Sequence, residues 1–223
     1  MKKVFTILSV IMALTAFSTP ASAQFTFDKD IIEPVSHIGF GYNIVNTNAF
    51  KSSYSEEFFV NILTLNLFPV ENFGVQIGVD YKTVGFESKD DAFYLDGNKK
   101  VQAEPFKDKY PVSYTKNYSR FRTNTFSAPV MLTVEAGNFS MSAGAEANLN
   151  LTGRVKDKYL VNGKKVKNID KGAQFNRFNY NFIFSLSYDD TGLYVKYYPK
   201  SSKLMPEGSI DLDFWSVGVV FDM

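Results

Sequence analysis

The sequence predicts an all-β fold: an eight-stranded antiparallel up-and-down transmembrane β-barrel with short periplasmic turns and long extracellular loops. Eight stretches alternate apolar and polar residues, which is the period-two pattern of a strand with two different faces. The gaps between these stretches alternate long and short along the chain. Outer-membrane barrels have this rhythm because tight turns join their strands on one side of the membrane and long loops join them on the other.

The N-terminal residues predict a signal peptide at 1–23, followed by one barrel domain at 24–223. Two lysines precede an apolar run from Val4 to Phe17, and a positive start before a short apolar run is typical of a secretory signal. Small residues at Ala21–Ala23 supply a cleavage site, so we expect the mature chain to start at Gln24. The run is shorter than the roughly 20 apolar residues of a membrane-spanning helix, which argues against an anchor.

The composition excludes several classes of protein. The chain has no cysteine, so disulfides, thiol catalysis, thiolate metal sites and a lipid anchor on an N-terminal cysteine are excluded. The signal carries two of the 24 basic residues and none of the 23 acidic ones, so the mature net charge is near −1. This balance argues against a nucleic-acid partner. Aromatic residues make up 16% of the chain, which fits the aromatic girdles of a lipid-facing surface.

The clearest predicted strand runs from Phe139 to Leu151. Apolar side chains on one face alternate with small or polar ones on the other over its whole length, which is long against the usual 5–6 residues or so of a soluble strand. The same pattern predicts strands at 38–44, 58–68, 73–81, 126–134, 178–188, 193–198 and 212–223. The stretch 58–68 is apolar on both faces at its centre, so its lipid-facing row stays unassigned.

Three tight turns and four long connections join these strands. Gly137-Asn138 is a two-residue hairpin signal that pairs Ala136 with Phe139. The turn at 189–192 is expected to pair Tyr188 with Leu193, and 69–72 forms the third. The long connections span 47–57, 87–124, 153–175 and 199–211, and all are expected to be extracellular. Two of them contain similar hairpin tips, at 94–101 and 159–166, which we expect to continue barrel strands outward.

Four short motifs lie at the entry to the fourth predicted strand, the centre of the fifth, the end of the seventh and in the last strand. They are Thr125–Pro129, Gly144–Glu146, Tyr194–Pro199 and Trp215–Phe221. With these motifs the chain resembles the PorT-type outer-membrane β-barrel family of Bacteroidetes over most of its mature length. The resemblance implies an eight-stranded barrel in the outer membrane. One branch of that family serves a protein-secretion apparatus, so an accessory role in secretion is one implied function.

Five charged residues fall on predicted inward faces and form a candidate interior polar network: Asp80, Lys82, Glu135, Glu146 and Lys196. Eight strands enclose a space just wide enough for side chains, and charges inside it must pair or stay hydrated. We expect salt bridges that fill the interior. The alternative is a polar channel or proton path, which would make the chain a narrow pore.

Seven basic residues of the third long connection form a candidate loop contact: Arg154, Lys156, Lys158, Lys164, Lys165, Lys167 and Lys171. Only Asp157 and Asp170 oppose them, so this loop carries a net charge of +5. It can contact lipopolysaccharide phosphates, an anionic glycan or an acidic protein, or be simply a solvated loop. The expected partners are outer-membrane lipid and lipopolysaccharide, with a protein at the loops or periplasmic turns as a further candidate.

The sequence predicts no catalytic, cofactor or metal site. His37 is the only histidine, it lies at the predicted periplasmic rim, and a histidine metal site needs several ligands. We therefore expect an integral outer-membrane barrel that is not an enzyme and acts through structure or its extracellular loops. The alternatives are a narrow pore, a secretion accessory, a barrel enzyme that uses His37, and a soluble β-sandwich, which would expose a large apolar patch.

Overall fold

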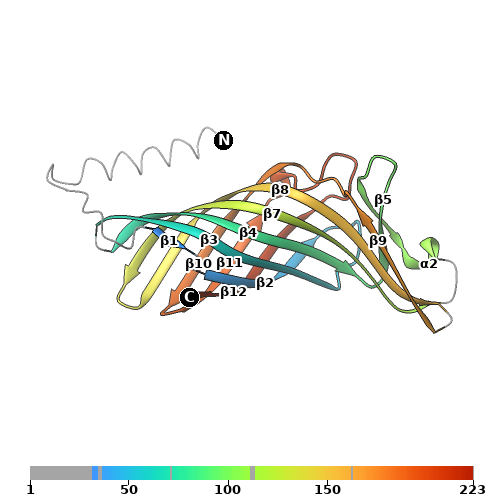
Figure 1. Cartoon of the computed structure of the whole chain (residues 1–223), viewed down its shortest axis with the longest axis horizontal. Coiled ribbons are helices and arrows are strands. Elements are labelled where there is room, and N and C mark those ends of the chain that lie inside the picture. The colour runs from blue at the N-terminus through green and yellow to red at the C-terminus, as the bar shows by residue number, and fades with distance from the viewer. Residues whose placement is uncertain (1–31, 35–36, 71, 111–113, 162, 223) are drawn as a thin grey trace.

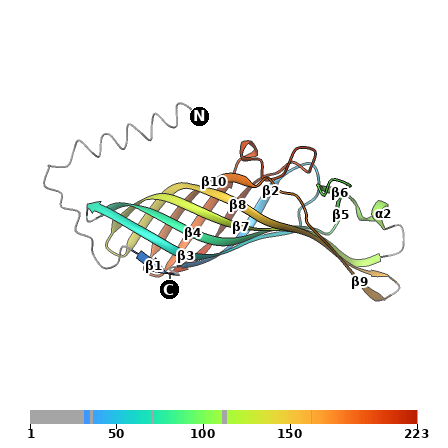
Figure 2. The ribbon, with the colours of Figure 1, turned by 45° about the horizontal axis from the view of Figure 1, so that its top comes forward.

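Eight long strands form a closed antiparallel ring in the computed structural model, which describes residues 32–34, 37–70, 72–110, 114–161 and 163–222. The strand order is β3-β2-β12-β11-β10-β8-β7-β4, and pairing of β3 with β4 closes the ring (Figures 1 and 2). The predicted eight-stranded up-and-down barrel is thus confirmed. The predicted signal peptide lies outside the described residues.

Six of the eight ring strands are longer than the alternating stretches that predicted them, whereas β10 has the predicted bounds and β12 starts at Asp213 instead of 212. The ring strands are β2 (His37–Asn46), β3 (Tyr54–Val70), β4 (Phe73–Ser88), β7 (Tyr114–Ala136), β8 (Phe139–Val161), β10 (Phe178–Tyr188), β11 (Thr191–Tyr198) and β12 (Asp213–Asp222). The shorter elements are β1 (Ile32–Pro34), β5 (Asp91–Leu95), β6 (Val101–Pro105), α2 (Phe106–Lys109), β9 (Lys164–Lys171) and the 3-10 helix η1 (Lys200–Ser202). No helix of the described chain has the length and apolar character needed to cross a membrane.

Away from the loop end, the alternation places mainly apolar residues outside and mainly polar residues inside. On β10, every apolar residue of the row from Phe178 to Tyr188 is exposed, whereas Asn179 and Asn181 are buried. The lipid-facing row of β3, which the sequence left unassigned, is interrupted by a bulge after Asn61. A bulge sets an extra residue against the partner strand and shifts the alternation by one position, which is why this stretch has no single apolar face.

Of the two hairpin registers that the sequence predicted, one is confirmed and one differs. Ala136 pairs with Phe139 across a turn in which Gly137 has φ 60°, a conformation that glycine adopts without strain. Tyr188 pairs with Thr191 and not with Leu193, so that prediction is wrong. The turn contains two residues because Asp189 takes a positive φ of 48°, and aspartate tolerates this conformation. The register differs by two residues, which leaves the facing of β10 and β11 unchanged.

The predicted long connections contain more regular structure than expected. β8 continues past the ring to Val161 and returns as β9, so Tyr159 pairs with Val166 in a hairpin that does extend a barrel strand. The other expected tip forms as well, with Leu95 paired to Val101, but β5 and β6 make a separate two-stranded sheet. The chain leaves β4 there because the Ser88 hydroxyl accepts the backbone N–H of Asp91 in a tight turn.

An aromatic cluster fills the loop end of the barrel. Ring strands contribute Phe86, Phe121 and Phe214, while Phe50 and Phe93 come from the connections. The ring centroids of Phe86 and Phe121 lie 4.8 Å apart, as do those of Phe93 and Phe121. Leucine, isoleucine and methionine side chains from the last long connection complete the cluster: Leu204, Met205, Ile210 and Leu212. This end of the barrel is therefore capped by its own loops.

Candidate functional site

A closed ring of polar contacts crosses the barrel interior beneath the aromatic cluster. We call its five members the charge ring: Glu57, Lys82, Glu146, Lys196 and Tyr198. Lys82 Nζ lies 2.7 Å from Glu146 Oε2 and donates to the Tyr198 hydroxyl at 2.9 Å. That hydroxyl donates to Glu57 Oε2 at 2.6 Å. Lys196 Nζ closes the ring, 2.9 Å from Glu57 Oε1 and 2.8 Å from Glu146 Oε1.

The charge ring spans the full width of the interior. Lys82 is on β4 and Lys196 is on β11, which lies directly opposite β4 in the ring of eight strands. The side chains of Lys82, Lys196, Glu57 and Glu146 are at most 1% exposed. Two ammonium groups meet two carboxylates, so the buried charges balance, as burial of ions requires.

Further polar and aromatic side chains fill the space around the charge ring. Lys82 also donates to Asn181 Oδ1 at 3.3 Å, and Asn148 donates to the same oxygen at 2.8 Å. Lys196 Nζ lies 4.0 Å from the centroid of the Phe59 ring, a cation–π contact. The centre of the barrel is therefore filled by side chains.

Four of the five residues that the sequence placed in the interior network lie in this part of the barrel. Lys82, Glu146 and Lys196 belong to the charge ring, and Asp80 is buried beside it, where it accepts a 2.8 Å hydrogen bond from Asn61. Glu135 does not join them: it is half-buried at the turn end of β7, where its backbone N–H donates to Asn72. It lies ten residues from Thr125, the β7 partner of Lys82, which is about 33 Å along a strand.

Sequence reasoning missed two members of the charge ring. The sequence places Glu57 in the long connection 47–57, because the alternation on its strand is interrupted and does not mark where the strand begins. Tyr198 shares an inward face with Lys196 two residues earlier, and this spacing was the available signal. His37 lies at the start of β2 with its ring 5.8 Å from that of Phe59 in an edge arrangement, so it packs against the same aromatic side chain as Lys196.

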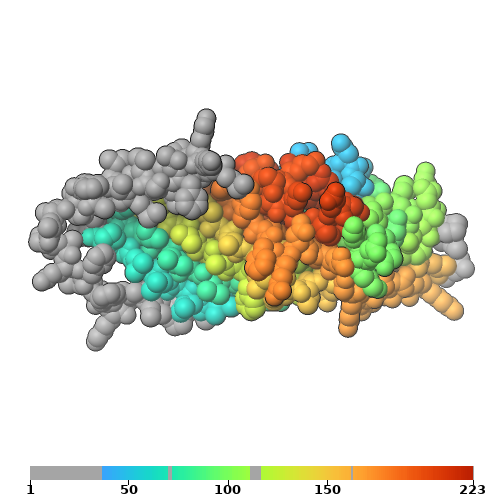
Figure 3. All heavy atoms as spheres, turned by 90° about the horizontal axis from the view of Figure 1, so that it is seen from above, coloured from blue at the N-terminus to red at the C-terminus, as the bar shows by residue number. Residues whose placement is uncertain are grey.

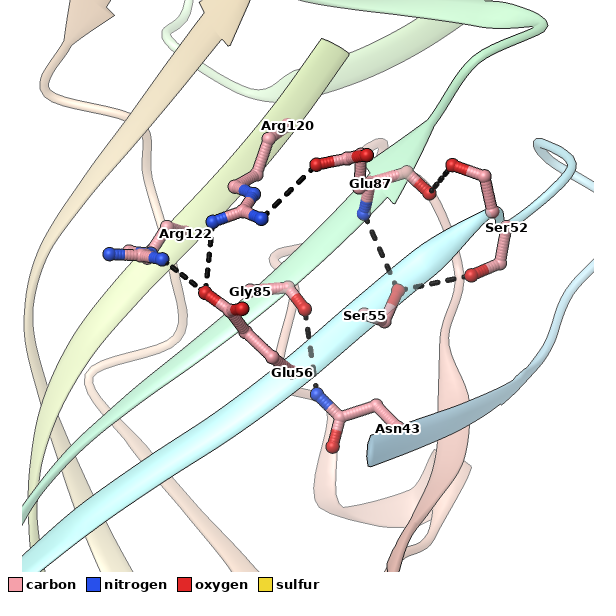
Figure 4. A network of polar contacts seen from close by, with 9 residues as sticks. Asn43, Ser52, Ser55, Glu56, Gly85, Glu87, Arg120 and Arg122 are labelled. Carbon is pink, nitrogen blue, oxygen red and sulfur yellow. Dashed lines mark hydrogen bonds and ion pairs between the residues drawn. The ribbon is translucent and has the colours of Figure 1, made fainter. Parts of the chain in front are cut away.

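The exposed apolar side chains around the barrel, such as the row on β10, form an apolar belt. A second polar cluster lies on the outer wall, on the loop side of this belt, and Figure 4 shows its side chains pointing toward one another. Arg120 on β7 reaches Glu56 Oε1 at 2.9 Å and Glu87 Oε2 at 3.1 Å, and Arg122 also contacts Glu56. Glu56, Gly85 and Arg122 form one cross-strand row. Because glycine has no side chain, Glu56 extends across β4 to the arginines.

The hairpin of β8 and β9 continues this outer wall with basic residues. Directly paired residues of antiparallel strands point to the same face, and three such pairs are Arg154 with Lys171, Lys158 with Lys167, and Lys156 with Ile169. We define the basic face as the six outward residues Arg154, Lys156, Lys158, Lys165, Lys167 and Lys171. Lys164, the seventh residue of the predicted loop contact, pairs with Val161 on the opposite face.

The two faces of this hairpin differ in what covers them. On the inner face, Tyr159 packs with Ala92 and Phe106, and Figure 3 shows the β5–α2 segment beside the β8–β9 hairpin at one end of the molecule. Asp157 is buried there and accepts hydrogen bonds from Ser119 and Tyr110. Burial raises the pKa of the Asp157 carboxyl, although these two hydrogen bonds oppose the shift.

The basic face carries positive charge that its surroundings do not balance. Within the described ranges, no carboxylate forms an ion pair with any of its six side chains. Partial burial lowers the pKa of the Lys156 ammonium, and the nearby Lys158 and Lys167 lower it further, against the effect of Tyr118. Lys158 lies 5.3 Å from the centroid of the Tyr118 ring.

Comparisons with known proteins give similarity to solved structures only. No family model matches the chain, and no curated protein sequence matches it. The chain is similar to Ail, the attachment invasion locus protein of Yersinia pestis, with a TM-score of 0.37 and 11% identity over 85% of this chain and 97% of that one. It is also similar to the outer membrane protease OmpT from Escherichia coli, with a TM-score of 0.35 and 11% identity over 81% and 68% of the two chains. At these scores the similarity assigns no activity.

Two sequence-based expectations change with these comparisons. One of the two similar proteins is a protease, which contradicts the expectation that the chain is not an enzyme, and that expectation is withdrawn. The outer-membrane β-barrel class is supported by the eight-strand ring. The narrower assignment to the PorT-type family gains no support, because no family model matches.

Proposed function

We propose that this chain is an outer-membrane barrel whose interior is closed to solutes and whose projecting end is its contact surface. The charge ring is the observation that carries this proposal. It joins opposite strands through contacts of 2.6–2.9 Å between fully buried side chains. A polar interior closed in this way favours a role on the outside of the barrel over conduction.

The dimensions of the outer surface support insertion in an outer membrane. The exposed apolar row of β10 is 11 residues long. At about 3.3 Å per residue and a tilt of about 40°, such a row covers roughly 25 Å, the height of the apolar band in this class of barrel. Tyr188 and Phe139 meet at the turn end of the row, and Tyr197 and Trp215 stack on the neighbouring strands, as aromatic girdles do.

The projecting end supplies the contact surface. β7 and β8 are 23 residues each, about twice the 9–11 or so that a spanning strand needs. They extend beyond the ring together with β9, while the turns at the other end are short (Figure 1). An accessory role in protein secretion is a narrower form of this proposal, and it requires a protein partner on the projecting surface.

Single-cysteine labelling tests the orientation and the location, because the chain has no native cysteine. Asn98→Cys lies at the β5–β6 tip and Asn138→Cys lies in the tight turn between β7 and β8. We expect a membrane-impermeant maleimide to label Asn98→Cys on intact cells and to label Asn138→Cys only after the outer membrane is opened. The reverse pattern, or recovery of the protein outside the outer-membrane fraction, would overturn the proposal.

A further inference from the structure

The basic face stands on one wall of a sheet that continues the barrel. Three cross-strand rows run through it: Arg122–Arg154–Lys171, Arg120–Lys156–Ile169 and Tyr118–Lys158–Lys167. The two arginines of β7 are engaged with Glu56 and Glu87. The uncompensated charge therefore comes from β8 and β9, and it lies on the face that continues the lipid-facing wall.

Protection of an exposed strand edge explains only part of this pattern. β9 pairs with β8 alone, and lysines on an edge strand discourage pairing with other chains. This effect accounts for Lys165, Lys167 and Lys171, but not for Arg154, Lys156 and Lys158, whose strand is paired on both sides. It also leaves unexplained why Asp157 and Asp170 are both on the opposite face.

The height of the basic face above the apolar belt identifies the kind of ligand. Toward the loop end of β7, Phe126 is the last exposed apolar residue, and Arg122 lies four residues beyond it, earlier in the sequence. Four residues correspond to about 13 Å along a strand, or about 10 Å in height at a tilt of about 40°. The first row of the basic face is thus at the level of lipid headgroups, and the next rows are above it.

We propose that the basic face binds the phosphate groups of lipopolysaccharide in the outer leaflet around the barrel. This inference rests on the proposed function, since it needs the long-loop end to be outside the cell. Phosphates fit because several ammonium groups and one guanidinium are spaced along paired strands without carboxylate partners. A ligand that approaches along the lipid-facing wall needs no access to the capped interior.

The test compares two variants of equal charge in detergent micelles. In the face variant, Lys156, Lys158, Lys167 and Lys171 are changed to Gln. In the control variant, four exposed lysines away from the face are changed to Gln: Lys89, Lys99, Lys107 and Lys164. Each folded barrel is titrated with purified lipopolysaccharide and with the same lipopolysaccharide after removal of its phosphates. Heat-modifiable mobility in gels confirms that each variant is folded.

We expect the face variant to bind lipopolysaccharide at least about tenfold more weakly than the unmodified chain, since each basic residue near an anionic surface contributes substantially to binding. The control variant should stay within about twofold, and the dephosphorylated ligand should bind weakly to all three proteins. Equal affinities of the face and control variants, or of the two ligands, would overturn the inference.

The cysteine labelling described above separates the two proposals. Suppose that the cysteines are labelled as expected but the face variant binds lipopolysaccharide as tightly as the unmodified chain. This result rejects the lipopolysaccharide site and leaves the proposed function standing. Inverted labelling rejects the proposed function and with it the lipopolysaccharide source, even if the face variant loses phosphate binding in micelles.

Discussion

At the scale of single residues, the charge ring joins five buried side chains through five polar contacts. Glu146 is its centre, because its two oxygens contact Lys82 and Lys196 separately. A buried ion pair stabilises little beyond an apolar pair of the same size, but the loss of one partner leaves an unbalanced buried charge. Removing one charge from the ring should therefore destabilise the barrel more than removing one positive and one negative charge together.

Glu146→Gln should destabilise the barrel by about 3–5 kcal/mol, because two buried ammonium groups then share one carboxylate. Urea unfolding of the barrel in lipid vesicles measures this change. The double variant Lys82→Met with Glu146→Gln keeps the neutral pair of Lys196 and Glu57, so its loss should be smaller than the sum of the two single losses by about 0.5–3 kcal/mol. An unchanged urea midpoint in Glu146→Gln would contradict a structural role for the ring.

Asp157 gives the projecting end a pH dependence of its own. Burial raises the pKa of its carboxyl above the ordinary 3.8, so the folded state holds this proton more tightly than the unfolded state does. The local stability that depends on it is present below the ordinary pKa and is lost as pH rises through the raised value. Hydrogen exchange of α2 and Tyr110, corrected for the intrinsic rate, should therefore be slower at a pH below the ordinary pKa than at a pH above the raised pKa.

Asp157→Asn should remove that pH dependence, because an amide keeps hydrogen-bonding capacity for Ser119 and Tyr110 without a titrating charge. Asp190→Asn, exposed in the turn at the opposite end of the barrel, is the matched control and should behave like the unmodified chain. A pH dependence that persists in Asp157→Asn would assign it to another group.

At the scale of elements, the strands are specified by alternation and the hairpins by turn residues. Phe139–Leu151 was predicted from alternation, and the structure extends the strand to Val161. The tip at 159–166 was expected to continue a barrel strand, but alternation of apolar residues did not predict a strand at 152–158, because lysine and arginine predominate among its outward residues. The paired basic rows are therefore a property of β8 and β9 that alternation of apolar residues does not detect.

Val130→Arg tests the lipid-facing assignment of β7. Val130 is 49% exposed on the outer wall, and arginine near the middle of the lipid face costs about 2–4 kcal/mol. Folding yield and urea midpoint in vesicles should both fall. Ile169→Arg is the matched control, since Ile169 is 41% exposed on β9 beyond the apolar belt, and it should leave both quantities within experimental error. Equal effects of the two substitutions would contradict the assigned position of the belt.

At the scale of the whole molecule, two layers close the barrel. The aromatic cluster caps the loop end, and the charge ring fills the space beneath it. The aromatic cluster combines residues from strands and connections, and the charge ring combines residues from the four strands β3, β4, β8 and β11. Conduction would require both layers to open together.

The unmodified barrel should accordingly be silent in planar lipid bilayers, in contrast to a porin inserted in the same membranes as a positive control. The reason is that ions crossing the interior would have to displace fully buried, charge-balanced side chains. Reproducible single-channel steps from the unmodified chain would show that the interior opens, and the narrow-pore alternative would then replace the closed barrel.

The sequence by itself determined the eight-strand pattern, the position of the tight turns and the presence of charges on inward faces. Alternation has a period of two, so it reports the two faces of a strand wherever one is apolar and the other is polar. It also placed Lys82, Glu146 and Lys196 inside, because each occupies an inward position in the alternation of its strand.

Only the tertiary structure decided which of these charges meet, what closes the barrel and where the basic residues point. Glu57 joins the charge ring because the barrel closes β3 against β4, and Glu135 is excluded because it is too far along its strand. The basic face exists because β9 folds back on β8 in a fixed register. Pairing register sets such contacts over long sequence separations, and a one-residue shift would send each side chain to the other face.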